Sequence, residues 1–178
     1  VHPRVLVRVE SGASATVIED FIGLGDGVYC TNAVSEFHVS ANATLSHVRL
    51  QRESAKAFHI GTGAVRVERD ARFASVSVAT GGRIPRLALE LGQAGEGAPI
   101  TLSGLALIGE GQLADTHSVV DHAQPHGTSR QLHKCVAAGN AHVVFNGKIA
   151  VRRGAQLTDS AQQSRNLLLS PRAHVDTK

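Results

Sequence analysis

One short frame recurs along the chain and restricts its possible folds more than any other feature. Two residues rich in Gly, Ser, Asn, Asp or charged side chains are followed by Ala or Gly, a polar residue and usually an apolar one. The small residue falls at Ala13, Ala43, Ala71, Gly111, Ala141, Ala155 and Ala173. Most intervals lie near one or two multiples of about fifteen residues, which is typical of a stacked repeat. In the widest interval, the Gly-rich stretch 92–99 is expected to form a loop inserted into the repeat.

Short alternating segments lie between these turns. They are VLVRVE (5–10), LSHVRLQ (45–51), AVRVERD (64–70), ASVSVAT (74–80) and KIAVRR (148–153). Period-two alternation rich in Val, Ile and Thr predicts half-buried strands, and no long segment has the 3.6-residue period of a helix. A sandwich or barrel would not require a small residue at one recurring phase. The pattern therefore predicts an all-β chain folded as a β-solenoid, with two strands per coil and about six coils of roughly 30 residues.

We predict a single domain, residues 1–178. Its composition limits which partners it can bind and whether it can contact a membrane. The net charge is +3, the basic residues are scattered, and aromatic residues make up 3% with no Trp, so we expect no nucleic-acid partner. The chain has no run of eighteen apolar residues and no signal peptide, so we expect no membrane contact. A chain without Met that begins at Val1 is expected to be a fragment of a longer protein.

The cysteines and histidines are the residues that could carry metal chemistry. Cys30 and Cys135 are far apart and form no C-x-x-C pair, which favours a reducing compartment in which each is a small buried residue. His117, His122 and His126 lie within ten positions of one another, and His133 follows. Alternation along a strand predicts that His122 and His126 share one face and that His117 points to the other.

A metal site built from these histidines is the less favoured interpretation. Along an extended strand His122 and His126 would be ~13 Å apart, too far for one metal bound at ~2.0–2.1 Å, unless a turn at 124–125 folds them together. We therefore expect histidines hydrogen-bonded to Asp115, Asp121 or the backbone. A zinc site completed by neighbouring coils stays open as the alternative.

No sequence motif predicts a catalytic site. GLGDG (23–27) lacks the G-x-G-x-x-G spacing, and Ser118, Asp121 and His122 come without the G-x-S-x-G turn of a hydrolase nucleophile. Carbohydrate-active solenoids use paired carboxylates and aromatic platforms, yet the chain has one Tyr and five Phe residues. We predict a protein that is not an enzyme. The alternative is a metal-binding or carbohydrate-active solenoid enzyme that uses segment 117–126, with Asp121 among its residues.

The last third of the chain carries the most specific motifs. They are Asp115-Thr116, Asp121-His122 followed by Pro125-His126 and Thr128-Ser129, Phe145-Asn146-Gly147-Lys148-Ile149, Asn166-Leu167-Leu168-Leu169-Ser170 and Thr177-Lys178. Together with PRVLVRVESGASATVIEDF (3–21), they give the chain a resemblance to the SufB/SufD family of iron–sulfur cluster assembly proteins. It looks most similar to the SufD members, and the likeness runs through the whole chain in one order.

The resemblance implies a right-handed parallel β-helix and a scaffold subunit of the cytosol or plastid stroma. Such a subunit pairs with SufB and binds the ATPase SufC through helical regions that this fragment lacks. The family's cluster-site residues would begin just after Lys178. The iron–sulfur cluster is thus expected in the assembled complex, with no cofactor or metal in this fragment.

Three residues remain as weak candidates for a cofactor site: His122, His126 and Cys135. Cys135 stands where SufD-like chains usually carry a small residue, so we interpret it as a packing variant. The sulfur-accepting cysteine of SufB has no convincing counterpart here, which favours the SufD type. Exposed strand edges predict that the isolated chain forms a homodimer.

Overall fold

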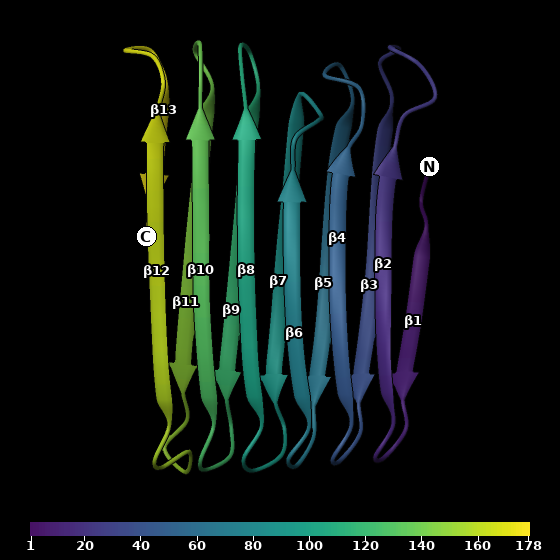
Figure 1. Ribbon diagram of the computed structural model, residues 1–178, viewed down its shortest axis with the longest axis vertical. Coiled ribbons are helices and arrows are strands. Elements are labelled where there is room, and N and C mark those ends of the chain that lie inside the picture. Colours follow the sequence, from purple (N-terminus) through teal and green to yellow (C-terminus); the bar gives the residue numbers. More distant parts are fainter.

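The computed structural model describes residues 1–178 as thirteen strands in two parallel sheets, with no helix (Figure 1). One sheet contains β1 (Arg4–Val9), β3 (Cys30–Val39), β5 (Phe58–Val67), β7 (Ile84–Gln93), β9 (Leu113–His122), β11 (His142–Val151) and β13 (His174–Thr177). The other contains β2 (Ser14–Ile22), β4 (Thr44–Arg52), β6 (Arg72–Ala79), β8 (Pro99–Ile108), β10 (Thr128–Ala137) and β12 (Asp159–Leu168). No helix is present that could cross a membrane.

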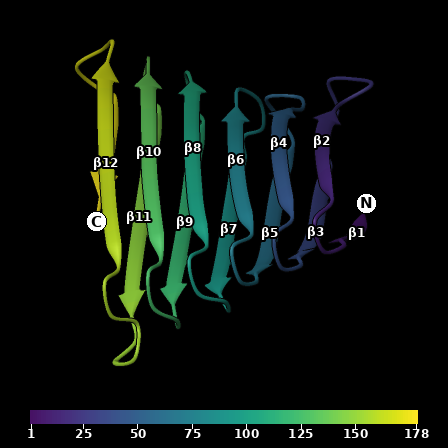
Figure 2. The ribbon, with the colours of Figure 1, turned by 60° about the horizontal axis from the view of Figure 1, so that its bottom comes forward.

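Successive strands alternate between the two sheets, so each coil contributes one strand to each (Figure 2). Cys30 pairs with Phe58, and Phe58 pairs with Ile84, which shows how equivalent residues stack from coil to coil. All strand pairs are parallel, as stacked coils of one hand require. The predicted all-β solenoid with two strands per coil and about six coils is confirmed.

The recurring frame marks the turns that join the sheets. The second turn residue adopts a left-handed backbone at Asn42 (φ 59°) and at Asp70 (φ 55°), a conformation that Asn and Asp tolerate better than most residues. The small residue comes next and is fully buried at Ala43 and Ala71. The narrow corner between the sheets therefore explains why only a small side chain recurs at this phase.

Two details of the predicted repeat are wrong. Gly111 is the left-handed turn residue (φ 74°), so Gln112 takes the third position and its Nε2 donates to the carbonyl of Gly82 at 2.7 Å. The stretch 92–99 contains no inserted loop, because its ends belong to β7 and β8 and residues 94–98 form a regular turn between them. Gly97 is left-handed there (φ 68°) and Ala98 is fully buried at the small-residue position.

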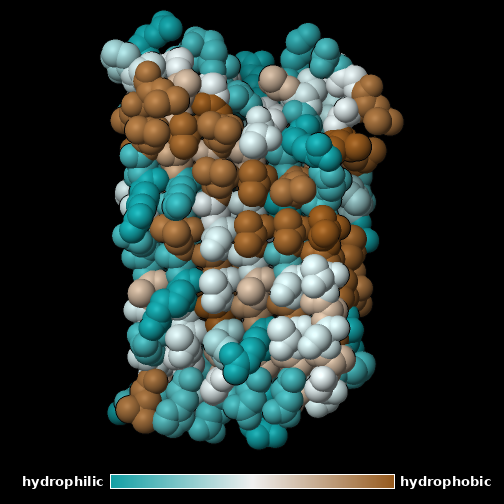
Figure 3. Space-filling model, in the orientation of Figure 1, coloured by the Kyte–Doolittle hydropathy of each residue, from teal (hydrophilic) through white to brown (hydrophobic).

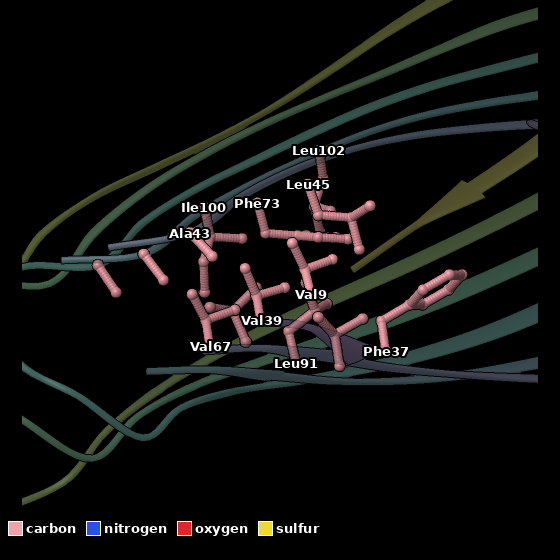
Figure 4. Close-up of a cluster of buried hydrophobic side chains, with 14 residues drawn as sticks. Val9, Phe37, Val39, Ala43, Leu45, Val67, Phe73, Leu91, Ile100 and Leu102 are labelled. Carbon is pink, nitrogen blue, oxygen red and sulfur yellow. The ribbon is translucent and has the colours of Figure 1, made fainter. Parts of the chain in front are cut away.

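The larger of two apolar core clusters lies between the sheets next to one row of turns (Figure 4), and the smaller one lies beside the other row in the later coils. Val39, Val67 and Leu91 reach the larger cluster from the ends of odd-numbered strands, while Leu45 and Phe73 reach it from the beginnings of even-numbered ones. These five side chains are at most 2% exposed. Burial of such surface contributes the main favourable free energy of folding.

A second apolar feature lies on the outer surface of the even-numbered sheet. Leu107 and Leu167 both pair with Val136, and Leu169 follows β12. Figure 3 shows apolar side chains gathered at the upper left, where β10 and β12 end. Leu107, Leu167 and Leu169 are 46%, 54% and 60% exposed. We call Leu107, Val136, Leu167 and Leu169 the leucine ladder.

Candidate functional site

The middle of the coil interior is polar, in contrast to the apolar core beside the turns. The buried polar side chains between the sheets include Thr31, Ser35, His47, Arg49, Gln51, Glu53, His59 and Ser75 in the first coils, and Gln93, Ser118, His122, Ser129, Gln131 and His133 in the later ones. Buried polar groups are stable only when they are hydrogen-bonded. Their partners therefore decide what this interior can do.

Glu19 of β2 is the centre of the first group. Its carboxylate accepts hydrogen bonds from Ser35 Oγ at 2.5 Å, from His47 Nε2 at 2.9 Å and from Arg49 Nη1 at 3.1 Å. Burial alone would raise the pKa of Glu19, but the hydrogen bonds from His47 and Ser35 and the charge of Arg49 outweigh it and lower the pKa to about 2. Glu19 is therefore a buried carboxylate at neutral pH.

Arg49 extends the group to the opposite sheet. Its Nη2 donates to His59 Nε2 at 2.8 Å, and His59 Nδ1 lies 2.5 Å from Glu53 Oε2. Thr31 Oγ1 donates to the other oxygen of Glu53 at 2.6 Å. The guanidinium also packs 4.3 Å from the ring centroid of Phe21, an attractive cation–π contact.

The proton positions on His59 follow from its partners. Arginine can only donate, so Nε2 of His59 accepts and the ring proton lies on Nδ1, facing Glu53. Burial and the neighbouring charge of Arg49 lower the pKa of His59, which agrees with a neutral ring. Glu19, Arg49, His59 and Glu53 thus form one connected network that crosses the coil.

This network leaves no space for a ligand larger than a water molecule. The two cavities lined by its side chains have volumes of about 10 and 30 Å³, enough for about one water each. Its charged groups are satisfied by each other and not by an open site. The arrangement can hold neighbouring coils in register, and it offers no space for a substrate.

His122 belongs to a second interior group and has no exposed surface. Its Nδ1 lies 2.7 Å from Gln93 Oε1, and its Nε2 lies 3.0 Å from Ser129 Oγ. An amide oxygen only accepts, so Nδ1 carries the proton and Nε2 accepts from the serine. Burial lowers the pKa of His122. A Cβ at Gly127 would meet His122 Nδ1 at 2.5 Å, so the following turn leaves room only for glycine.

His133 and Cys135 lie side by side in the interior of β10. The His133 ring stacks on Phe145 with 4.3 Å between centroids, and its Nδ1 is 3.3 Å from Cys135 Sγ. Burial lowers the pKa of His133 to about 4 and raises that of Cys135 to about 11. A buried neutral thiol is a packing residue. Cys30, however, is exposed and not buried as predicted, because its neighbour Thr31 takes the inward position of the alternation.

The other two predicted histidines lie outside the coil. His117 Nε2 lies 2.8 Å from Asp115 Oδ1 but without hydrogen-bond geometry, and Asp121 pairs with Arg152 and not with a histidine, so the predicted histidine hydrogen bonds to Asp115 or Asp121 are not found. His126 occupies a left-handed turn position (φ 56°), 3.6 Å from Glu96. The predicted opposite orientation of His117 and His122 is confirmed, whereas the shared face of His122 and His126 is wrong because the strand ends first.

The weak candidates therefore do not form one site. His122 is inside the coil, His126 is on a turn, and Cys135 has the interior His133 as its partner. The structure instead brings together His142, His174 and Asp176 on the outer surface, with ligand atoms within 4.8 Å of one another. Sequence reasoning missed this group because its members come from β11 and β13, more than thirty residues apart.

The interior network was also missed, although the sequence contains a signal for it. His47, Arg49, Gln51 and Glu53 alternate with Val48 and Leu50 in the segment 47–53. Either parity could face inward, and the apolar one is the usual choice. Leu45 is buried and has the same parity as the small turn residue Ala43, two positions earlier, and this odd-numbered parity is that of the polar residues.

Fold and interior together define a parallel β-solenoid in which buried polar side chains join the coils. Residues 1–178 match the family model described as "SUF system FeS cluster assembly, SufBD core domain". The chain therefore belongs to the SufBD core family, and the resemblance seen in its motifs is confirmed.

Three curated relatives illustrate the match. The chain is 40% identical over 179 residues to the chloroplastic protein ABCI7 of Arabidopsis thaliana, covering 99% of this chain and 38% of the relative. It is 36% identical over 186 residues to the SufBD family protein slr0076 of Synechocystis sp., covering 100% and 41%. It is 34% identical over 177 residues to the iron–sulfur cluster assembly protein SufD of Escherichia coli, covering 99% and 42%. The chain thus spans about two fifths of these relatives.

Proposed function

We propose that the protein is the β-helical core of a SufD-like scaffold subunit in iron–sulfur cluster assembly. The observation that carries this proposal is the match of all residues 1–178 to the SufBD core model. In this role it pairs with a SufB counterpart and is joined to the SufC ATPase through parts outside these residues. It supplies no catalytic residue, and the cluster is held in the assembled complex. Its proposed location is the cytosol or the plastid stroma, and a chloroplastic relative supports the second of these.

The interior supports a scaffold role by making the coil rigid. Glu19 of β2 joins His47 and Arg49 of β4, and His47 joins Ser75 of β6, so the same network ties three successive strands of one sheet together. Each of these bonds requires the coils to stay in one register. A multi-subunit assembly site needs its supporting elements held closely in place.

The leucine ladder supports the placement of the partner near the last coils. Its side chains leave apolar surface exposed where β10 and β12 end (Figure 3). Contiguous exposed apolar surface is typical of a protein–protein interface. We propose that this surface contacts the SufB counterpart through Leu167 and Leu169, which lie within the last coils of residues 140–178, and through the neighbouring Leu107 and Val136.

Co-purification of the full-length protein with its SufB and SufC counterparts tests the proposal. The double variant Leu167→Lys, Leu169→Lys places two charges on the ladder and is expected to reduce SufB recovery at least about tenfold while SufC recovery persists. Val76→Lys is the matched control, because Val76 is 44% exposed on β6 of the same sheet. Equal SufB recovery with wild type and both variants would contradict this placement, and no SufB recovery with wild type would contradict the function.

The isolated 178-residue chain provides a second test. The outer edge of β12 has no neighbouring strand, and exposed edges favour strand addition. We expect a homodimer by light scattering at high concentration. A mass equal to that of the monomer would contradict this expectation.

A further inference from the structure

Three side chains that can bind metals meet on the outer surface of the last coil. His142 begins β11, His174 begins β13, and the two residues are direct partners in the parallel register. Asp176 follows His174 by two positions and so lies on the same face. Neighbouring parallel strands are ~4.8 Å apart, so this register brings the two imidazoles within reach of one ion.

The carboxylate of Asp176 lies between the imidazoles. Its Oδ2 is 2.8 Å from His142 Nε2, and its Oδ1 is 3.3 Å from His174 Nε2. The ring centroids of the two histidines are 5.0 Å apart with an interplanar angle of 70°. Both Nε2 atoms thus point to the same place, where a cation could replace their hydrogen-bonding protons.

Charge distinguishes this group from the His117–Asp115 and His38–Glu68 pairs, and the presence of a second histidine distinguishes it from the His126–Glu96 pair. Asp115 faces one histidine, His117, and its charge is balanced by Arg86 at 2.6 Å. Glu68 likewise pairs with Arg66 at 2.7 Å. Asp176 has ion-pair partners only in its two histidines. The negative charge of Asp176 can therefore be balanced only by its two histidines or by a bound cation.

Hydrogen bonding keeps Asp176 available as a ligand. The hydrogen bond from His142, together with nearby His174, lowers the pKa of Asp176 despite a small opposing effect of desolvation. The ionised carboxylate, which is the form that binds a cation, is therefore favoured. All three side chains are also at least 36% exposed, so an ion can reach them from solvent.

We propose that His142, His174 and Asp176 bind a divalent first-row transition metal ion. Two imidazoles and one carboxylate suit Fe²⁺, Co²⁺ or Zn²⁺ better than Ca²⁺ or Mg²⁺, which prefer oxygen ligands. Three protein ligands leave the remaining coordination positions to water. The proton at each Nε2 moves to Nδ1 or to solvent as the nitrogen lone pair binds the ion. The site does not depend on the scaffold role and adds a binding function to it.

Metal titration of the full chain tests the site. The chain is stripped with a chelator and titrated with Co²⁺, whose visible absorption reports its ligands, and with Fe²⁺ under anaerobic conditions. Wild type is expected to bind one equivalent more than Asp176→Asn or His142→Gln, or to bind at least about tenfold more tightly.

His117→Gln is the matched control, since it removes a histidine from a pair that Arg86 already balances. It should leave the titration unchanged. Circular dichroism identifies any variant that fails to fold, and His174→Gln then replaces it. Absence of binding to wild type, or equal binding by wild type and the folded ligand variants, would overturn the proposal.

Discussion

Strands β2 and β4 are joined by two arginine–carboxylate pairs, one inside the coil and one on its outer surface. Arg49 and Glu19 are 5% and 8% exposed, while Arg52 and Asp20 are 57% and 34% exposed. The outer pair has the shorter contacts, at 2.6 and 2.9 Å against 3.1 Å. Burial and not distance decides how much each pair contributes to the free energy of unfolding, because water stabilises the outer charges whether or not they pair.

The largest effect is expected when the interior pair is broken. Arg49→Met leaves Glu19 without its cation and removes a donor to His59. Removing one partner of a buried ion pair costs about 3–5 kcal/mol, because the remaining charge is buried and uncompensated. Urea unfolding followed by circular dichroism measures the loss. A change below about 1 kcal/mol would show that water reaches Glu19.

Acid should expose a second difference between interior and surface. Burial lowers the pKa of His133 from 6.5 to about 4, so its neutral form is favoured in the folded state. The stability that depends on it is fully present above pH 6.5 and is lost as the pH falls through about 4, by about 3 kcal/mol. The variant His133→Gln should flatten this part of the stability profile. An unchanged slope would mean that His133 is not the group that titrates.

Space in the interior can be tested with two glycines. A Cβ at Gly127 would meet Gln93 Oε1 at 2.2 Å and His122 Nδ1 at 2.5 Å, whereas a Cβ at Gly154 meets nothing within 4 Å. Gly127→Ala should therefore cost about 1–3 kcal/mol in the free energy of unfolding. Gly154→Ala should be neutral. Thermal unfolding of both variants checks this, and equal melting temperatures would be the contrary result.

The smallest effect on stability is expected when the ion pair on the outer surface is broken. Arg52→Met breaks the pair with Asp20, but both side chains remain in contact with water. The free energy of unfolding should not change beyond the error of urea denaturation. A loss as large as that of Arg49→Met would mean that the position of the pair is irrelevant.

Local constraints explain why the sequence predicts the fold. A left-handed turn residue followed by a buried small residue recurs at several corners, and Asn42–Ala43, Asp70–Ala71 and Gly97–Ala98 show this pair in adjacent positions. The turn that contains Gly111 was misaligned by one residue, since Gln112 fills its corner by hydrogen bonding and not by being small.

Distant partners explain why the site was harder to predict. Arg49 is stable inside the coil only because Glu19 lies in the previous coil, thirty residues earlier. Likewise, the metal-binding group combines His142 with residues of β13. The histidines of segment 115–129 are close in sequence but separated in space. His117 and His122 face opposite sides of one strand, and His126 lies in the turn that follows it.

The stacking of parallel strands from coil to coil has a consequence for the length of the molecule. Each coil adds a fixed step of ~4.8 Å along the axis, and the turns allow no intermediate step. The distance between two surfaces at opposite ends of the coil is therefore a whole number of these steps. Insertion or deletion of one coil would change the reach of the molecule by that one increment, and a smaller adjustment would have to be made outside the coil.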